Sequence, residues 1–97
     1  MTFEWDEQKR QENRRKHGID FADSLSFFDG PRYTWLDTRH DYGEDRWVSI
    51  GFLRNIIVVT VYTDRPGNVI HLISMRKALT HERKTFAEKL RHGLGPA

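Results

Sequence analysis

The chain has 97 residues and no cysteine, so we expect a single hydrophobic core without disulfides or cysteine-bound metal centres. Hydrophobic residues make up 37% of it and charged residues 31%, and the longest apolar run, residues 56–59, is far shorter than the ~20 residues of a membrane span. Residues 1–6 lack the pattern of a secretory signal. We therefore expect a soluble, cytoplasmic domain with no membrane partner.

The net charge of +2 is unevenly distributed along the chain. Residues 1–64 hold 9 Lys/Arg and 12 Asp/Glu, whereas residues 65–97 hold 7 Lys/Arg and 2 Asp/Glu. A second basic cluster lies between Lys9 and Lys16. Two separated basic clusters on a small domain indicate a polyanionic partner such as nucleic acid, and the alternative is that both are solvated helix faces.

Two helices are predicted at the start of the chain. Asp6 is a suitable N-cap and Gly18 a suitable left-handed stop, so the first helix covers residues 7–17. A second, shorter helix follows Asp20 and ends before Gly30-Pro31. The apolar side of this helix, which we expect to enter the core, consists of Phe21, Leu25 and Phe28.

From Arg32 onward, β-branched and aromatic residues predict strands. We expect them near residues 32–37, 46–52, 56–62 and 69–75. Short turns at residues 53–55 and 65–68 make these strands an antiparallel meander. Strand 56–62 is apolar on both faces, which is typical of a central strand.

A last helix is predicted over about residues 80–91, with Thr80 as its cap. Its apolar side consists of Phe86, Ala87 and Leu90. The expected fold class is therefore α+β: a small antiparallel sheet of about four strands, with two N-terminal helices and one C-terminal helix.

Several common site motifs are missing or incomplete. His81-Glu82 resembles the start of a zinc-protease helix, but Thr85 stands where the second histidine ligand belongs. The acids between Asp37 and Asp45 lack calcium-loop spacing, so we interpret this segment as a solvated loop and expect no metal site. The sequence has no glycine-rich phosphate loop and no nucleophile elbow, which leaves basic and imidazole chemistry.

The first helix carries a polar row at a spacing of four residues. Lys9, Asn13 and His17 share one side of this helix, and Lys16 lies beside them. Such a row can contact phosphates. The alternative is that Asn13 and His17 hydrogen-bond neighbouring loops and fix how the helix docks.

A second cluster surrounds the last strand and the last helix. Arg76 lies at the strand end and Arg83 on the helix, where both can converge on one phosphate and stabilise the charge of a phosphorane-like transition state. The alternative is pairing of an arginine with a carboxylate such as Glu82. Lys77 and Lys84 add positive charge, and His71 lies within the strand.

Several different spaced motifs are distributed along the whole chain. They are Trp5-Asp6-Glu7-x-Lys9-x3-Asn13-x2-Lys16-His17-Gly18-Ile19, then Phe21, Ala22, Phe27 or Phe28 with Asp29, and Pro31; in the middle His40, Glu44, Arg46-Trp47, Ile50-Gly51, Val59 and Tyr62-Thr63; and at the end Ile73-Ser74-x-Arg76-x-Ala78 with Glu82-Arg83-x2-Phe86. Over about residues 3–90 this order resembles the BrnT family, toxins of type II toxin–antitoxin systems. Phe86 departs from the tyrosine that the family has more often.

The resemblance implies a RelE-like ribonuclease fold and a metal-independent endoribonuclease without cofactor, which cleaves RNA and arrests translation and growth. It also implies a BrnA-like antitoxin that neutralises the toxin and brings it to operator DNA. A non-catalytic module that binds nucleic acid or only the antitoxin is the alternative function.

Under this hypothesis, Arg76 and Arg83 stabilise the phosphate. One of three histidines transfers the proton, and the sequence does not show which: the candidates are His71, His17 and His81. The residues expected to bind RNA are Lys9, Asn13, Lys16, Lys77 and Lys84.

Overall fold

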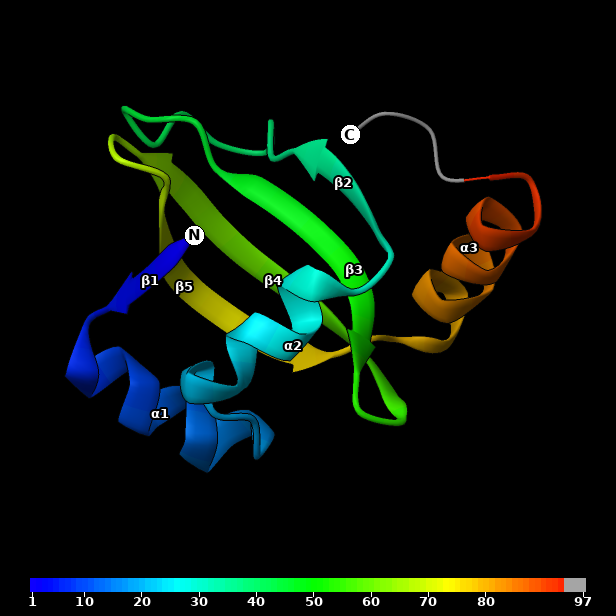
Figure 1. Cartoon of the computed structure of the whole chain (residues 1–97), viewed down its shortest axis with the longest axis horizontal. Coiled ribbons are helices and arrows are strands. Elements are labelled where there is room, and N and C mark those ends of the chain that lie inside the picture. Colours follow the sequence, from blue (N-terminus) through cyan, green and yellow to red (C-terminus); the bar gives the residue numbers. More distant parts are fainter. Residues whose placement is uncertain (94–97) are drawn as a thin grey trace.

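The chain forms a five-stranded sheet with helices on both of its faces (Figure 1). The computed structural model describes residues 1–93. Its elements are β1 (Thr2–Trp5), α1 (Glu7–His17), the 3₁₀ turn η1 (Phe21–Asp23), α2 (Ser24–Asp29), β2 (Arg32–Leu36), β3 (Trp47–Leu53), β4 (Ile56–Arg65), β5 (Val69–Lys77) and α3 (Thr80–Arg91). None of the helices in this part of the chain is long and apolar enough to cross a membrane.

The sheet has the strand order β1-β5-β4-β3-β2. Strands β2 to β5 form the predicted antiparallel meander, and β4 is the central strand. The expected antiparallel sheet of about four strands is present, and it is extended by one strand that was not expected: β1 pairs in parallel with β5, with Thr2 opposite Val69. This strand has only four residues and its partner is almost seventy residues away, so no local pattern predicts the pairing.

Helices α1 and α2 cover what we call the first face of the sheet (Figure 1). Its core contains Ile19, Phe21, Phe27, Phe28, Leu53, Val58, Tyr62, Ile70, Leu72 and Met75. The expectation that Leu25 enters this core is wrong, because its side chain is 58% exposed. Phe21 lies in a 3₁₀ turn, and this turn changes the helical phase, so that Phe27 rather than Leu25 points inward.

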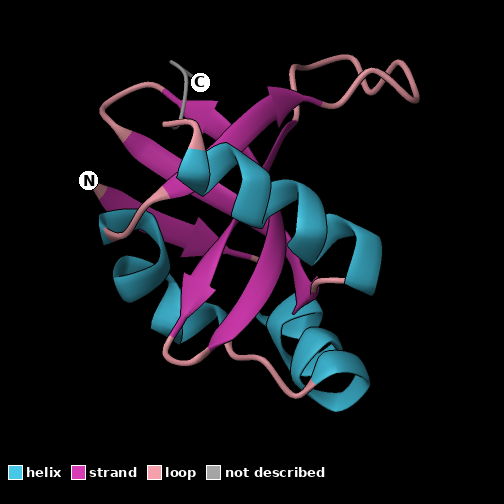
Figure 2. Cartoon of the chain, turned by 90° about the vertical axis from the view of Figure 1, so that its right-hand side faces the viewer, coloured by secondary structure: helices cyan, strands magenta, loops and turns pink. Residues whose placement is uncertain are grey.

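Helix α3 crosses part of the opposite, second face; it is the helix nearest the viewer in Figure 2. Phe86 packs there against Val48, Ile50, Val59 and Ala78. Ala87 and Leu90 are exposed, so the predicted apolar side of this helix is wrong in these two positions.

The predicted bounds of α3 are correct, but its cap is one residue earlier than predicted. Leu79 is the N-cap residue and has no side-chain acceptor. Its N–H donates instead to Oε1 of Glu82, at 2.7 Å. Glu82 is thereby held at the start of the helix, where a negative charge is favourable.

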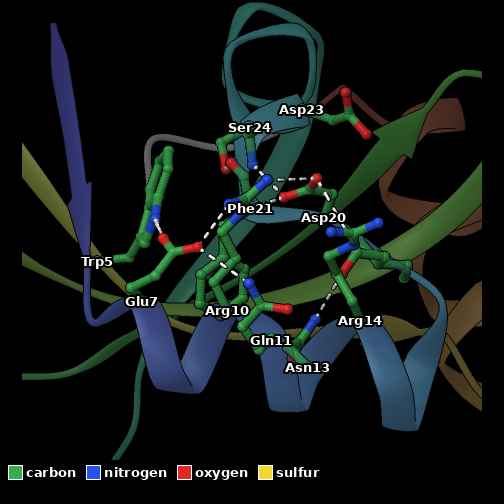
Figure 3. A network of polar contacts seen from close by, with 12 residues as sticks. Trp5, Glu7, Arg10, Gln11, Asn13, Arg14, Asp20, Phe21, Asp23 and Ser24 are labelled. Atoms are coloured by element: carbon green, nitrogen blue, oxygen red, sulfur yellow. Dashed lines mark hydrogen bonds and ion pairs between the residues drawn. The ribbon is translucent and has the colours of Figure 1, made fainter.

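Polar groups, rather than an apolar stripe, hold α1 against the sheet. Asn13 is 6% exposed, and its amide donates to the carbonyls of Ile19 and Met75 and accepts from the Met75 N–H. Figure 3 shows Arg10 between Glu7 and Asp20, both of which accept from its guanidinium. The structure therefore supports the docking interpretation of Asn13.

The central position of β4 predicts a large effect of truncation within it. Val59→Ala should lower the free energy of unfolding by about 1–4 kcal/mol, because the 2%-exposed side chain leaves a cavity in a small core. Leu25→Ala, at an exposed site, should change it by less than about 0.5 kcal/mol. Denaturant midpoints measure both values, and equal midpoints for the two variants would contradict the assignment of β4 as the central strand.

Candidate active-site groove

A β-bulge decides which way Arg76 points. Between β4 and β5, Val61 pairs with Ser74 and Tyr62 pairs with Leu72, so Ile73 is an extra residue in β5. In a regular strand, residues four apart share a face, and Arg76 would lie on the same side as the buried Leu72. The extra residue reverses the alternation and places Arg76 on the second face, beyond the part that α3 covers.

A hollow of about 340 Å³ lies on this uncovered part of the second face. We call it the arginine hollow; its lining includes Asp37, Arg39, Val48, Val59, Val61, Ser74, Arg76 and Glu82, together with Trp35, Leu36 and Thr38. The floor is apolar and comes from three strands, whereas the charged groups form the wall. A cleft of this kind, with few polar groups converging above an apolar floor, is the usual form of a binding site.

Arg76 is held in the arginine hollow by a two-point ion pair. Its Nη1 and Nη2 donate to Oε1 and Oε2 of Glu82 at 2.8 and 2.9 Å. These hydrogen bonds lower the pKa of Glu82 to about 2 and raise the pKa of Arg76. The carboxylate pairing that the sequence left open as an alternative is therefore present, and it orients the guanidinium toward the hollow's lining.

A second arginine faces the same hollow. Arg39 donates through Nε and Nη2 to both oxygens of Asp37, at 2.9 Å each. The Asp37 side chain is 2% exposed and that of Arg39 is 71% exposed, so a buried carboxylate holds a solvent-accessible cation. The hydrogen bonds from Arg39 lower the pKa of Asp37, and the positive charge of Arg39 opposes the rise in the pKa of Arg76. Both guanidinium groups therefore line the same hollow.

An apolar hollow of about 240 Å³ adjoins the arginine hollow. We call it the tryptophan hollow; it is lined by Tyr33, Trp35, Ile50, His81, Glu82 and Thr85. Trp35 and Glu82 line both hollows, so the two hollows are adjacent, and we refer to them together as the groove between the edge strand β2 and the start of α3.

The three candidate histidines lie in different places. His81 lines the groove. His71 is on the second face but roughly 15 Å along the strand from Arg76, where its Nδ1 is 3.1 Å from the Glu4 carboxylate. His17 is exposed at the end of α1, on the first face. Only His81 is therefore brought together with Arg76.

The other predicted residues are dispersed. Arg83 is bound by its own surroundings, since its guanidinium donates to the Ala78 carbonyl and to the Thr80 hydroxyl. Four lysines are partly or fully exposed at two sites: Lys9 and Lys16 on α1, and Lys77 and Lys84 at the junction of β5 and α3. The sequence analysis missed two groove residues, Arg39 and Trp35. Arg39 is separated from Arg76 by almost forty residues, and no local signal connects them.

Comparison with known proteins places this chain and its fold in one class. Residues 5–82 match the family described as "Ribonuclease toxin, BrnT, of type II toxin-antitoxin system". The chain is also similar to the 1.1 Å crystal structure of the Brucella abortus ribonuclease toxin BrnT, with 34% identity and a TM-score of 0.65 over 82% of this chain and 99% of that chain. No curated protein sequence matches the chain.

The class defined by these matches is that of the ribonuclease toxins of type II toxin–antitoxin systems. The family match spans most of the chain, and the protein belongs to the BrnT family. A toxin of this type has an RNA substrate and a cognate antitoxin. The resemblance seen in the spaced motifs, and the expected α+β class, are confirmed.

The ion pair of Glu82 predicts a defined loss of stability in acid. Because the folded-state pKa is lowered from the usual 4.5 to about 2, the stabilisation is complete above pH 4.5 and is lost as the pH falls toward 2. Glu82→Gln should lower the free energy of unfolding by on the order of 2 kcal/mol at pH 7, and this difference should vanish near pH 2. Glu88→Gln, at an exposed site on the same helix, is the control, and a difference from the parent that stays constant with pH would contradict the prediction.

Proposed function

We propose that the groove cleaves single RNA phosphodiester bonds without a metal ion. The 2′-oxygen of the substrate forms a bond to phosphorus as the bond from phosphorus to the 5′-oxygen breaks. The 2′-hydroxyl loses a proton and the leaving oxygen gains one, so the products are a 2′,3′-cyclic phosphate and a 5′-hydroxyl. Such a reaction needs a base, an acid and cations that stabilise the additional negative charge.

The observation that carries this proposal is the way in which Arg76 is held. A guanidinium has five N–H groups. Three of those in Arg76 are directed to Glu82 and to the Lys77 carbonyl. Within residues 1–93 no hydrogen bond uses its Nε–H or the second Nη2–H, and these two lie side by side on one edge. That edge matches two oxygens of one phosphate.

Arg39 and His81 supply the other functions in this proposal. Arg39 is a second cation at the same hollow, held by the buried Asp37. His81 is the imidazole on the groove wall, and imidazole is the side chain best suited to proton transfer near neutral pH. Arg83 is a positioning residue that holds the corner between β5 and α3.

We also propose that the cognate antitoxin is a BrnA-like protein that brings this toxin to operator DNA. The proposal extends the type II class of the family to a particular partner. The test is coexpression of the chain with the neighbouring short open reading frame. Copurification, relief of growth arrest and binding of the complex to the promoter fragment are the expected results, and growth arrest that persists in the presence of that product would contradict the proposal.

The experiment for the mechanism uses purified protein and a short RNA with excess chelator. Cleavage should continue in chelator and leave 2′,3′-cyclic phosphate and 5′-hydroxyl ends, which mass spectrometry identifies. The same strand with 2′-O-methyl groups should resist cleavage, because the nucleophile is blocked. Cleavage of the methylated strand, or cleavage only with added magnesium, would overturn the mechanism, and intact RNA in all reactions would favour a protein that only binds.

A further inference from the structure

Trp35 is an exposed aromatic residue on the edge strand β2. Its side chain is 39% exposed, and it is absent from both core clusters of the sheet. The ring of Tyr33 lies 5.7 Å away, centroid to centroid and tilted by 39°, so the two rings form an aromatic shelf along the strand. Lys89 Nζ lies 4.9 Å from the centroid of the Tyr33 ring and supports the shelf from α3.

The tryptophan hollow in front of this shelf suits a small planar ligand. Its volume of about 240 Å³ is below the range for drug-sized molecules and is sufficient for one aromatic ring system. Ile50 adds an apolar surface, while His81 and Thr85 place polar groups at its margin. Aromatic side chains beside a basic groove are the usual platform for the bases of single-stranded nucleic acids.

The position of the hollow identifies its ligand. The arginine hollow shares two wall residues with it, Trp35 and Glu82, so the shelf is adjacent to the hollow in which Arg76 can bind a phosphate. We infer that the tryptophan hollow is a nucleotide subsite in which one unpaired base of the RNA substrate stacks on Trp35. This inference rests on the proposed function for the identity of the strand, but it requires binding only and not a particular cleavage chemistry.

A stacked base in this subsite cannot also be paired. The shelf lies at the edge of the sheet and beside α3, so the base must leave its own helix to reach it. The substrate class is therefore single-stranded RNA or a loop, and a continuous duplex is excluded. Stacking tolerates every base, because each base has an aromatic face, and the subsite selects unpaired structure more strongly than sequence.

The test measures binding of a fully 2′-O-methylated RNA 12-mer, which is not cleaved by a 2′-hydroxyl mechanism. Trp35→Ala should weaken binding roughly 5- to 150-fold, the range for loss of one base–aromatic stack, and Trp35→Phe should retain most of the affinity. Leu25→Ala, at an even more exposed apolar site on the first face, should bind as the parent does. The same 12-mer annealed to its complement should bind the parent and Trp35→Ala equally weakly.

A second binding experiment changes the RNA instead of the protein. Removing all bases from the 12-mer should weaken binding to the parent, and this loss should be smaller in Trp35→Ala, because the substitution and the abasic strand remove the same stack. Equal affinities of Trp35→Ala and the parent would overturn the subsite, as would a Trp35→Ala variant that binds RNA normally but no longer responds to the antitoxin. Failure of the metal-free mechanism would instead appear in the product ends and leave these affinities unchanged.

Discussion

Arg76→Ala should lower the rate of RNA cleavage by about 10²- to 10³-fold, the usual effect of removing one preorganised donor from a developing anionic centre. Arg76 is the cation that the bulge in β5 turns into the groove, and Glu82 fixes its orientation. Arg76→Lys should recover only a small part of the rate, because an ammonium group has no planar pair of donors. Single-turnover cleavage of a labelled RNA measures these rates.

Loss of the ion pair must be separated from loss of function in this experiment. Arg76→Ala leaves the Glu82 carboxylate without its partner and should lower stability as well. The double variant Arg76→Ala/Glu82→Gln removes both charges, and it should regain stability without regaining activity. Arg83→Ala removes a side chain that donates to the Ala78 carbonyl and the Thr80 hydroxyl, so it should lower the free energy of unfolding. Its effect on the cleavage rate should be smaller than that of Arg76→Ala. An active double variant would show that Arg76 acts only in the fold.

Asn13→Ala should be the most destabilising polar substitution in the chain. It removes three hydrogen bonds and leaves two buried carbonyls and one buried N–H without partners, at Ile19 and Met75. We expect a loss of about 3 kcal/mol or more, which corresponds to a fall in Tm of roughly 12–24 °C for a domain of this size. Thermal unfolding followed by circular dichroism measures it.

The matched control is Gln11→Ala, which also removes an amide from α1 but at an exposed site. Its side chain donates only to Glu7, at 3.3 Å, so the change in stability should stay within about 0.5 kcal/mol. The comparison also separates the two interpretations of Asn13 that the sequence left open. If Asn13→Ala kept the Tm of the parent and lost RNA affinity, the residue would act as a phosphate contact and not as a docking group.

Local physics made much of the fold predictable. Asp6 and Gly18 define α1 through a cap and a left-handed stop, which each depend on neighbouring residues only. The hairpins between β3, β4 and β5 follow from short turns, and their order predicts a central β4. The spaced motifs along the chain were also sufficient to identify the family, since a motif can be recognised without knowledge of where its side chains point.

Other features required the tertiary structure, because they depend on contacts between distant segments. The pairing of β1 with β5 joins residues 2–5 to residues 69–72, and the four residues of β1 carry too weak a local signal. In the sequence, Asn13 is one of several polar residues in a helical row. Its docking role becomes apparent only in the tertiary structure, where its amide donates to the Met75 carbonyl. Alternation along β5 predicts the wrong face for Arg76, because the bulge at Ile73 is visible only in the register with β4.

The sequence by itself therefore determined the helices, the meander, the family and the arginine at the end of β5. The tertiary structure decided which residues join that arginine: Arg39, His81 and Trp35, from three segments that are remote from one another. The physical reason is that secondary structure depends on neighbouring residues, whereas a site is made where the sheet brings distant strand ends and a helix start to one groove.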